Sequence, residues 1–442
     1  MFYKILSCSE EDGKLFVPDK FIANDTFINK ESVTIHAGLR AEGIEVVSRP
    51  SLEEDELMIS HNVLERLSIP SDIKYQVKLG ENSIKLGPVI GLLMVKRGEN
   101  LTKKRLYELN KYALLYSEMN GLLVAFSADS IDFAAHSVEG YCYNPVSDRS
   151  SMPWQKGRFP IPDSIFQRAD LPEAIRIKLI EVTGNRMFNS NSFNKWGFWK
   201  MISSYDPNHD YLPYTRPLRS IHDIDYMLEH YNTIYLKPIN GTLARGLYKV
   251  TKERGSYVFQ GKSGSDTTRT SSLEETKDYI KQITCSHLYV VQQAVHPVMI
   301  NNRHIDFRVI MQKDHSLKWI NTGIVAFLGT RGSICSNWGF QTSFEDVFAN
   351  YFDFSQEQIY KKKQEVIAVC KKVCDILDLS GENYGDLGFD VIIDESLKPW
   401  ILETNKRHYH IVPLWINDAQ TFYAVKTNPI KYASALSGFS VY

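Results

Sequence analysis

Short runs in which apolar and polar residues alternate, separated by turn residues, fill the first part of the chain. Segments such as EDGKLFVPD, KESVTIHAG and GIEVVSRPS show the alternation that is typical of strands, with Gly, Pro, Asp or Ser near their ends. Residues 60–69 have the spacing of a short helix instead. The pattern therefore predicts a small β-rich domain over residues 1–87.

The pattern changes at the Gly87-Pro88 pair. A continuous apolar run at residues 88–95 has the length of a buried strand, and residues 100–121 have helical period with a Gly at the end. A second apolar run follows at residues 122–128. Strand, helix and strand in this order predict a βαβ unit with parallel strands, and we assign residues 88–185 to an α/β domain.

Helices and strands are interspersed in the rest of the chain. Residues 190–204, 272–283 and 356–379 have helical period. Strands are predicted for the apolar or alternating runs at residues 233–239, 247–253, 256–260, 288–295, 305–314, 316–329, 389–394 and 398–404. The mixture predicts an α+β domain over residues 186–430, followed by a C-terminal tail over residues 431–442.

Composition excludes several classes of protein. The 442 residues are 43% hydrophobic and 23% charged, so the chain is able to bury real cores and is not disordered. Its 51 basic and 52 acidic residues argue against nucleic-acid binding through a dominant basic surface. It has no apolar run near the roughly 18 residues of a membrane helix and no secretory signal at its start. We expect a cytoplasmic protein with neither nucleic acid nor membrane as a partner.

The six cysteines are scattered and form no C-x-x-C motif. Cys370 and Cys374 stand four residues apart within a predicted helix. The favoured interpretation is that both are small buried residues on a packed helix.

The strongest chemical signal is the last predicted hairpin, YGDLGFDVIIDESLKPWILETN. If Asp394 pairs with Pro399 across a four-residue loop, Asp390 lies opposite Glu403. Because side chains alternate along a strand, Glu403 and Asn405 share a face, which Asp390 joins from the neighbouring strand.

Two carboxylates and an amide on one face suit a hard divalent cation. Like charges directly opposite destabilise a sheet, and Mg²⁺ typically takes one or two carboxylates together with substrate phosphates. The alternative is a solvated face with Lys and Arg neighbours. For three oxygen-bearing side chains in register within such apolar strands, we favour the metal.

A second element joins a strand, a lysine and a glycine loop, in TIYLKPINGTLARGLYKV. Lys237 ends the strand, and Gly241, Thr242 and Gly246 lie in the loop that follows. Glycines let backbone N–H groups approach a phosphate, and the lysine adds a point charge. The Walker A order is absent, and a plain β-turn with a surface lysine is the alternative.

Three further features carry weaker signals. Lys195 opens a helix, where it either contacts phosphate or is solvated. Arg308 alternates with apolar residues in the DFRVIMQ strand, so it needs a carboxylate or an anionic ligand as a partner. Arg331, Ser336 and Asn337 form a polar loop that offers one wall of a phosphate site or has no function.

The order of these elements resembles that of the ATP-grasp superfamily. The resemblance is carried by the helix lysine, the strand–Lys–Gly/Thr loop, the VVQQAV strand, D-F-R, S-N and D-x12-E-x-N. More narrowly, LGPVIGLLM after a β-rich segment resembles the YheC/YheD family of endospore coat-associated proteins. The resemblance covers about residues 85–425. It implies a mixed α+β and α/β chain: an ATP-grasp fold of two subdomains after a pre-ATP-grasp domain and the small β-rich domain.

The resemblance also implies cofactors and roles. ATP would lie between the two subdomains, with one or two Mg²⁺. The residues implied for phosphate contact are Lys195, Lys237, Gly241, Thr242 and Gly246. Main-chain groups implied to meet adenine are those of Gln293, Ala294 and Val295. The implied metal ligands are Asp390, Glu403 and Asn405, and the residues implied to stabilise the transferred phosphoryl group are Arg308 and Asn337.

Three positions depart from the family pattern. The glycine loop reads GTLARG, S-N is followed by WGFQ, and E-x-N is followed by KRHYH. The departures concern the lid and the acceptor site and leave the three metal ligands intact.

Three functions stay open from the sequence. The first is an ATP-dependent ligase that joins a carboxylate to an amine through an acyl phosphate. The task of the protein in such a reaction is mainly to position the substrates and to neutralise charge. The second is a nucleotide-binding, non-catalytic protein associated with the spore coat, with coat proteins as partners. The third is phosphoryl transfer to a small molecule, which ranks last because nothing marks His408 or His410 as a nucleophile.

Overall fold

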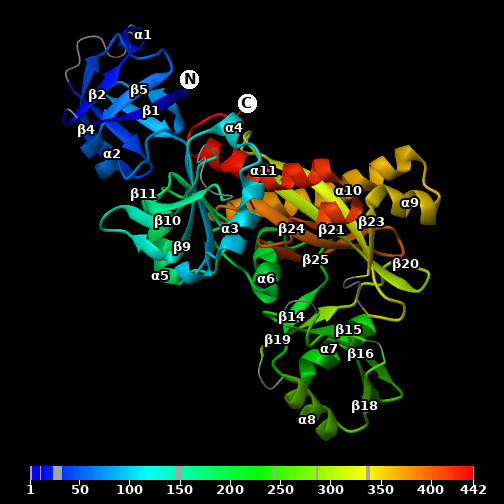
Figure 1. Ribbon diagram of the computed structural model, residues 1–442. Coiled ribbons are helices and arrows are strands. Elements are labelled where there is room, and N and C mark those ends of the chain that lie inside the picture. Colours follow the sequence, from blue (N-terminus) through cyan, green and yellow to red (C-terminus); the bar gives the residue numbers. More distant parts are fainter. Residues whose placement is uncertain are drawn as a thin grey trace.

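Four β-sheets follow one another along the chain (Figure 1). The computed structural model describes residues 2–9, 11–22, 32–145, 152–241, 244–263, 265–284, 287–334 and 339–441. The candidate residues Thr242 and Asn337 lie outside this described part, and so does Ser336.

The first sheet is a closed barrel in the order β1-β5-β2-β4-β3-β7-β6. Its elements are β1 (Phe2–Cys8), β2 (Lys14–Val17), α1 (Asp19–Ile22), β3 (Val33–Ala37), β4 (Arg40–Ser48), β5 (Glu56–Ser60), α2 (His61–Leu67), β6 (Lys74–Leu79) and β7 (Ser83–Gly87). The alternating pattern buries Val33, Ile35 and Ala37 on one side of β3, as expected for a sheet with one wet face. The β-rich start of the chain is confirmed.

The second sheet has the order β11-β10-β9-β8-β12-β13. Its elements are β8 (Val89–Val95), η2 (Gly98–Asn100), α3 (Lys103–Leu109), η3 (Asn110–Tyr112), α4 (Tyr116–Met119), β9 (Leu122–Asp132), β10 (Ser137–Tyr143), β11 (Trp154–Pro160), β12 (Ser164–Gln167), α5 (Glu173–Val182) and β13 (Met187–Phe188). β8 pairs with β9 and with β12 in parallel, as the βαβ pattern predicts.

The single helix predicted at residues 100–121 is wrong in detail, because the segment forms two short α-helices with a 3-10 turn between them. Leu109, Tyr112, Leu115 and Tyr116 are all buried in one core. These four positions would also share one face of a single helix, so the pattern predicted their burial correctly and only the continuity of the helix wrongly.

The third sheet, in the order β14-β19-β15-β16-β17-β18, follows helix α6 (Lys195–Tyr205). Its elements are β14 (Thr215–Pro217), α7 (Ile221–Tyr231), β15 (Thr233–Pro238), β16 (Tyr248–Glu253), β17 (Ser256–Gly261), β18 (Thr267–Thr270), α8 (Leu273–Thr284) and β19 (Tyr289–Gln293).

The fourth sheet has the order β23-β22-β21-β24-β25, with β20 paired to β21. Its elements are β20 (Met299–Ile300), β21 (Arg303–Lys313), β22 (Trp319–Leu328), β23 (Phe340–Ser343), α9 (Phe344–Phe352), α10 (Gln356–Leu379), β24 (Asp386–Ile393), β25 (Pro399–Asn405), η4 (Val412–Ile416) and α11 (Ala419–Leu436). The predicted pairing of the 305–314 and 316–329 segments is confirmed by β21 and β22.

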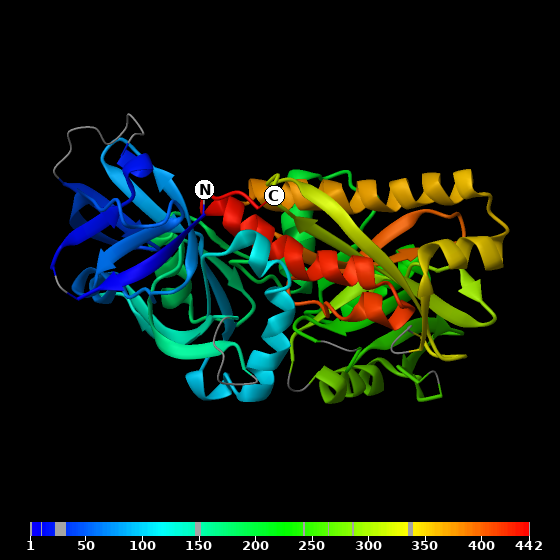
Figure 2. The same cartoon turned by 45° about the horizontal axis from the view of Figure 1, so that its top comes forward.

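The two faces of the fourth sheet differ. The odd-numbered residues Val309, Phe389 and Val391 join a core with α9 and α10, in which Cys370 and Cys374 are also fully buried. The interpretation of these two cysteines as packed core residues is therefore confirmed. On β21 and β24 the even-numbered residues face the opposite way, and helix α11 contacts β21 and β22. Figure 2 shows α10 and α11 running along the sheet.

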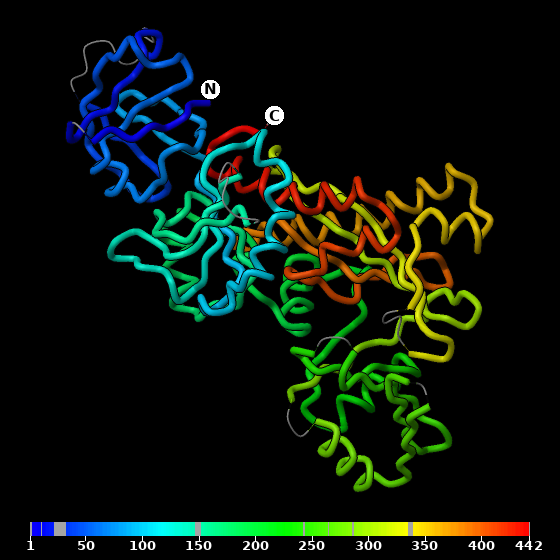
Figure 3. Tube along the Cα trace, in the orientation of Figure 1, coloured from blue at the N-terminus to red at the C-terminus, as the bar shows by residue number. Residues whose placement is uncertain are grey.

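The end of the chain returns to its beginning. The boundary predicted at residue 430 falls inside α11, whose residues Ile430, Tyr432 and Ala433 are buried against the second sheet. Gln76 Nε2 of the barrel donates to the Ser440 carbonyl oxygen over 2.7 Å. The two chain ends accordingly lie near each other (Figure 3). Residues 431–441 are thus packed structure and not a tail.

Candidate functional site

A cavity of about 240 Å³ lies between the third and fourth sheets. Strands β15 and β19 form one wall, and β21, β24 and β25 form the other. Of the residues predicted to form the site, those that line this cavity are Lys195, Lys237, Gly241, Gln293, Val295, Arg308, Asp390 and Glu403. Segments that are far apart in the sequence therefore converge on one space.

Strand pairing places Asp390 directly opposite Glu403. The register proposed for the loop is wrong, because Ile393, and not Asp394, pairs with Pro399. A bulge at Leu402 compensates for this shift, so that the ladder beyond it has Asp390 and Glu403 in register. Bulges commonly re-aim side chains beside functional sites.

Hydrogen bonds link the three predicted metal ligands. Asn405 Nδ2 donates to Glu403 Oε1 over 3.2 Å and to Asp390 Oδ2 over 3.4 Å. Arg308 Nε donates to Asp390 Oδ1 over 2.6 Å, so the carboxylate partner expected for this arginine is present. Lys195 Nζ lies 3.5 Å from Glu403 Oε2.

The two acids respond differently to this environment. Burial raises the pKa of Asp390 to about 7, with Glu403 and Asp306 adding to the rise and Arg308 opposing it. Burial also acts to raise the pKa of Glu403, but Lys195 and hydrogen bonds with Asp390 and Asn405 outweigh it, and the pKa is lowered. The pair thus shares a proton near neutral pH, which is the behaviour of two acids with too little positive charge between them.

The donor chemistry fits a hard divalent cation. Two carboxylates and an amide are oxygen donors of the kind that Mg²⁺ takes, and a cation would relieve the repulsion between the acids. The Asn405 amide nitrogen now faces the carboxylates, so this side chain would turn its oxygen toward a cation.

Both predicted lysines reach the cavity. Lys195 is the first residue of α6, whose cap is Asn194, and its Nζ donates to the Gly241 carbonyl oxygen over 2.6 Å. Lys237 Nζ donates to Gln292 Oε1 over 2.5 Å. Two positive side chains therefore stand beside the acid pair and the start of the glycine loop.

Gly241 and Gly246, the two glycines of the loop, differ in their place in the structure. Gly246 has φ of +69°, and a Cβ there would lie 2.6 Å from the Tyr289 hydroxyl oxygen. This position therefore needs glycine. Gly241 lines the cavity, whereas Gly246 does not.

The predicted adenine-contacting segment is only partly free. The Gln293 N–H donates to the Tyr214 carbonyl over 2.8 Å, and the Ala294 N–H donates to the Thr233 carbonyl over 3.2 Å. Within the described part of the chain, the Val295 N–H has no hydrogen-bond partner. Among these three N–H groups, Val295 supplies the available donor.

Asp306 and Gln292 are among the cavity residues that the sequence analysis did not predict. Asp306 lies two positions before Arg308 on β21 and lines the same cavity, so the alternation in D-F-R already carried the signal. Gln292 accepts from Lys237 and donates to Thr215 Oγ1 over 2.9 Å. No local pattern marks Gln292. Arg331 is exposed and does not line the cavity, although Ile334 of the same loop does.

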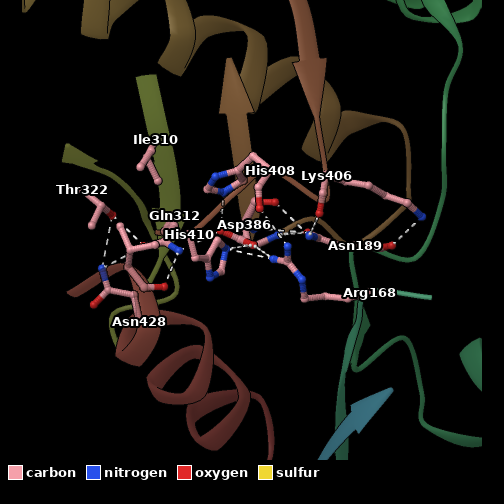
Figure 4. A network of polar contacts seen from close by, with 12 residues as sticks. Arg168, Asn189, Ile310, Gln312, Thr322, Asp386, Lys406, His408, His410 and Asn428 are labelled. Carbon is pink, nitrogen blue, oxygen red and sulfur yellow. Dashed lines mark hydrogen bonds and ion pairs between the residues drawn. The ribbon is translucent and has the colours of Figure 1, made fainter. Parts of the chain in front are cut away.

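A second acidic centre lies four residues before Asp390 (Figure 4). Asp386 accepts hydrogen bonds from four side chains, His408 Nε2 at 3.0 Å, His410 Nε2 at 2.8 Å, Gln312 Nε2 at 2.7 Å and Arg168 Nη1 at 3.2 Å. Burial opposes ionisation, but the two histidines hold the pKa of Asp386 well below its ordinary value.

One Asp and two His resemble a set of metal ligands, and their ligand atoms lie within 4.8 Å of one another. The carboxylate already has four donors, however, and the Arg168 guanidinium supplies the positive charge. We interpret this network as structural. It also accounts for His408 and His410 after E-x-N, since both are buried and bonded to Asp386.

Comparisons with known proteins agree with this architecture. A family model described as YheC/D like ATP-grasp matches residues 184–436, more than half of the chain. The protein is thus of the ATP-grasp class. Within that class, the chain belongs to the YheC/D-like family.

Over its length, the chain is 23% identical to endospore coat-associated protein YheD of Bacillus subtilis (strain 168), covering 95% of each. Two solved structures are more distantly similar. D-alanyl-alanine synthetase A from Vibrio cholerae O1 is 11% identical with a TM-score of 0.43, covering 79% of this chain and 100% of that one. The ADP complex of purK, N5-carboxyaminoimidazole ribonucleotide synthetase, is 10% identical with a TM-score of 0.43, covering 80% and 78%. Among the described residues, none of the helices is long and apolar enough to cross a membrane.

Proposed function

We propose that the protein is an ATP- and Mg²⁺-dependent ligase that joins a carboxylate to an amine. The observation that carries the proposal is the convergence of Asp390, Glu403 and Asn405 with Arg308 on one side of the cavity. Lys195 and Lys237 line the same cavity, and Lys195 Nζ lies 3.5 Å from Glu403 Oε2. Together they form a centre for binding and neutralising a polyphosphate.

The proposed roles follow from the contacts. Asp390, Glu403 and Asn405 would hold Mg²⁺, whose charge would offset that of the phosphates. Lys195 and Lys237 would bind phosphate oxygens in place of Gly241 and Gln292, their present partners. The free Val295 N–H would donate to the adenine ring. Thr242, Gly246, Gln293 and Ala294 remain proposed nucleotide contacts, and Asn337 remains a proposed catalytic residue.

The reaction divides into two steps. A carboxylate oxygen of the first substrate attacks the γ-phosphorus of ATP, forming an acyl phosphate as the bond to ADP breaks. The amine nitrogen of the second substrate then attacks the acyl carbon, forming the amide and releasing inorganic phosphate and a proton. Arg308 would stabilise the phosphoryl group as it transfers. Its bond to Asp390 fixes the guanidinium at the cavity wall.

A second cavity provides room for the other substrates. It has a volume of about 780 Å³ and shares Lys195, Arg308 and Glu403 with the first. Small-molecule or peptide carboxylates and amines are the proposed partners. The location we propose is cytoplasmic, with association to the spore coat.

A nucleotide-binding coat protein without catalysis is the second candidate. The similarity to a protein named as coat-associated favours it. Both candidates predict nucleotide binding, and only the first predicts turnover.

The experiment compares Glu403→Gln with Glu395→Gln, an exposed acid in the turn of the same hairpin. With ATP and Mg²⁺, we expect the wild type and Glu395→Gln to melt at a higher temperature than without ligand. Glu403→Gln should lose most of this shift. Release of ADP and phosphate with pools of carboxylates and amines then distinguishes the ligase from the non-catalytic protein. No shift in the wild type contradicts both candidates.

A further inference from the structure

A third cavity, of about 710 Å³, lies at one edge of the second sheet. Met94, Val95 and Lys96 line it at the carboxyl end of β8, and Arg168 and Ala169 line it directly after β12. Because β8 and β12 are neighbouring parallel strands, their carboxyl ends meet at this edge. The cavity therefore lies outside the carboxyl ends of two adjacent strands.

The connections of the sheet change direction between these two strands. From β8 the chain passes through α3, η3 and α4 to β9 on one side, whereas β12, on the other side of β8, is reached only later. In open α/β sheets, ligands bind in the crevice outside the carboxyl ends of the strands at such a point. The topology thus favours this edge of the sheet as a binding site.

Positive charge predominates in the lining. Five of the twelve lining residues are basic and two are acidic. The basic residues are Lys96, Lys104, Arg105, Arg168 and Arg407, and the acidic residues are Glu108 and Asp170. A cleft lined mainly by one sign of charge concentrates ions of the opposite sign. The lining therefore favours an anion.

Two of the five basic residues are neutralised within the protein. Arg168 Nη1 lies 3.2 Å from Asp386 Oδ2, and Arg407 Nη2 lies 2.8 Å from Asp170 Oδ1. These two guanidinium groups already have carboxylate partners, so the charge available to a ligand comes from the other three residues.

Lys96, Lys104 and Arg105 are exposed to solvent. Within the described part of the chain, their side-chain nitrogens form neither an ion pair nor a hydrogen bond. Glu108, the remaining acid of the lining, forms no ion pair with them there. Three positively charged side chains on one cavity are thus accessible to a ligand that enters from solvent.

We propose that this cavity binds a small molecule with two or more anionic groups, phosphate or carboxylate, through Lys96, Lys104 and Arg105. A guanidinium bonds two oxygens of such a group at once, and each lysine adds a point charge. The cavity shares Asp170 and Arg407 with the cavity of about 780 Å³, so the bound anion lies beside the space proposed for the ligase substrates. The proposal concerns binding alone and does not depend on ligase activity.

Calorimetric titration of the full chain tests the proposal with two probes, in buffer without divalent cations. Pyrophosphate represents the phosphate groups, and propane-1,2,3-tricarboxylate represents the carboxylates. We expect the wild type to show a binding event that the triple variant Lys96→Gln/Lys104→Gln/Arg105→Gln lacks. Binding that persists in the triple variant belongs to other sites, such as Lys195 and Lys237. A response to one probe alone supports the proposal and identifies the group that is bound.

Lys103→Gln is the matched control for Lys104→Gln. The two lysines are adjacent exposed residues of α3, and of the two only Lys104 lines the cavity. We expect Lys104→Gln to weaken this binding about fivefold, the upper range for an exposed ion pair, and Lys103→Gln to leave it unchanged. Both substitutions are on the surface, where the effect on folding is small.

Two results overturn the proposal. One is equal titration of the wild type and the triple variant with both probes. The other is a crystal soaked with tungstate, an oxyanion located by its anomalous scattering, in which no anion lies within hydrogen-bond distance of Lys96, Lys104 or Arg105. Binding at these residues in a protein that does not respond to ATP and Mg²⁺ would contradict the proposed ligase and support this inference.

Discussion

Asp386 and Asp390 lie four residues apart on the same face of β24, and their surroundings are opposites. The Asp386 side chain is 0% exposed and accepts hydrogen bonds from four side chains. The Asp390 side chain is 21% exposed, faces a cavity and stands opposite a second acid. One position satisfies its charge within the protein, and the other does not.

The two pKa shifts express this difference. The pKa of Asp386 lies well below its ordinary value, despite burial, because donors surround it. The pKa of Asp390 is raised to about 7, because burial and two neighbouring acids outweigh one arginine. Burial alone therefore does not separate a structural carboxylate from a candidate ligand, whereas the number of donors around it does.

The largest expected effect is on the free energy of unfolding when Asp386, whose charge is satisfied by hydrogen bonds within the protein, is replaced. Asp386→Ala removes the fully buried carboxylate that forms an ion pair with the Arg168 guanidinium. The guanidinium charge then has no carboxylate to balance it at this position. We expect the free energy of unfolding to fall by about 3–5 kcal/mol, as for other broken buried pairs. Urea denaturation at pH 7 measures it.

The matched control is Asp390→Ala, which removes the same side chain from the same strand face. Loss of the bond to Arg308 is partly offset by relief of the repulsion from Glu403, so we expect a change within about 1 kcal/mol. Equal destabilisation of the two variants would show that the contrast between them is wrong.

The second expected effect is on ligand binding. Here Asp390, rather than Asp386, is the position at which a substitution should matter. Asp390→Asn keeps the shape of the side chain and removes the charge that the proposed Mg²⁺ needs. We expect the affinity for ATP with Mg²⁺ to fall at least tenfold, which is about 1.4 kcal/mol or more. Isothermal titration calorimetry measures it, with Asp375→Asn on the exposed surface of α10 as the control. Unchanged affinity in Asp390→Asn contradicts the metal role.

The sequence predicted these two positions unequally well. Alternation along a predicted hairpin was sufficient to place Asp390 opposite Glu403, because both acids lie in one local unit. The bulge at Leu402 was invisible, since no Gly marks it and it depends on the register of the whole ladder. The same alternation would have found Asp306.

The network around Asp386 was beyond prediction. Its partners Arg168, Gln312 and His410 come from three separate parts of the chain, and only the packing of the second sheet against the fourth brings them together. The segment KRHYH, which follows E-x-N, therefore resembled a departure from the family pattern. In the structure, its His408 and His410 complete a buried ion network around Asp386.

The last expected effect is on the pH dependence of stability, where the two positions have opposite signs. Burial lowers the pKa of His408 and His410, so below about pH 6.5 the unfolded chain binds more protons than the folded one. The network thus loses stability as pH falls below about 6.5, and Asp386, with its lowered pKa, adds to the loss below about pH 4. Asp390 acts the other way, because its raised pKa lets the folded protein bind a proton between about pH 4 and pH 7.

Asp390→Asn removes the proton that Asp390 binds in the folded protein, and with it the contribution that stabilises the fold as the pH falls. The destabilising contribution of His408 and His410 remains, because Arg168 stays charged beside them. From pH 7 to pH 5 we expect the variant to lose stability more steeply than the wild type, by up to about 1.4 kcal/mol per pH unit, the value for one proton. Thermal and urea unfolding across this range in the absence of divalent cations measure both slopes. Parallel slopes for the two proteins would mean that Asp390 is ionised in the fold, which contradicts its raised pKa and removes the electrostatic reason for a cation between the acids.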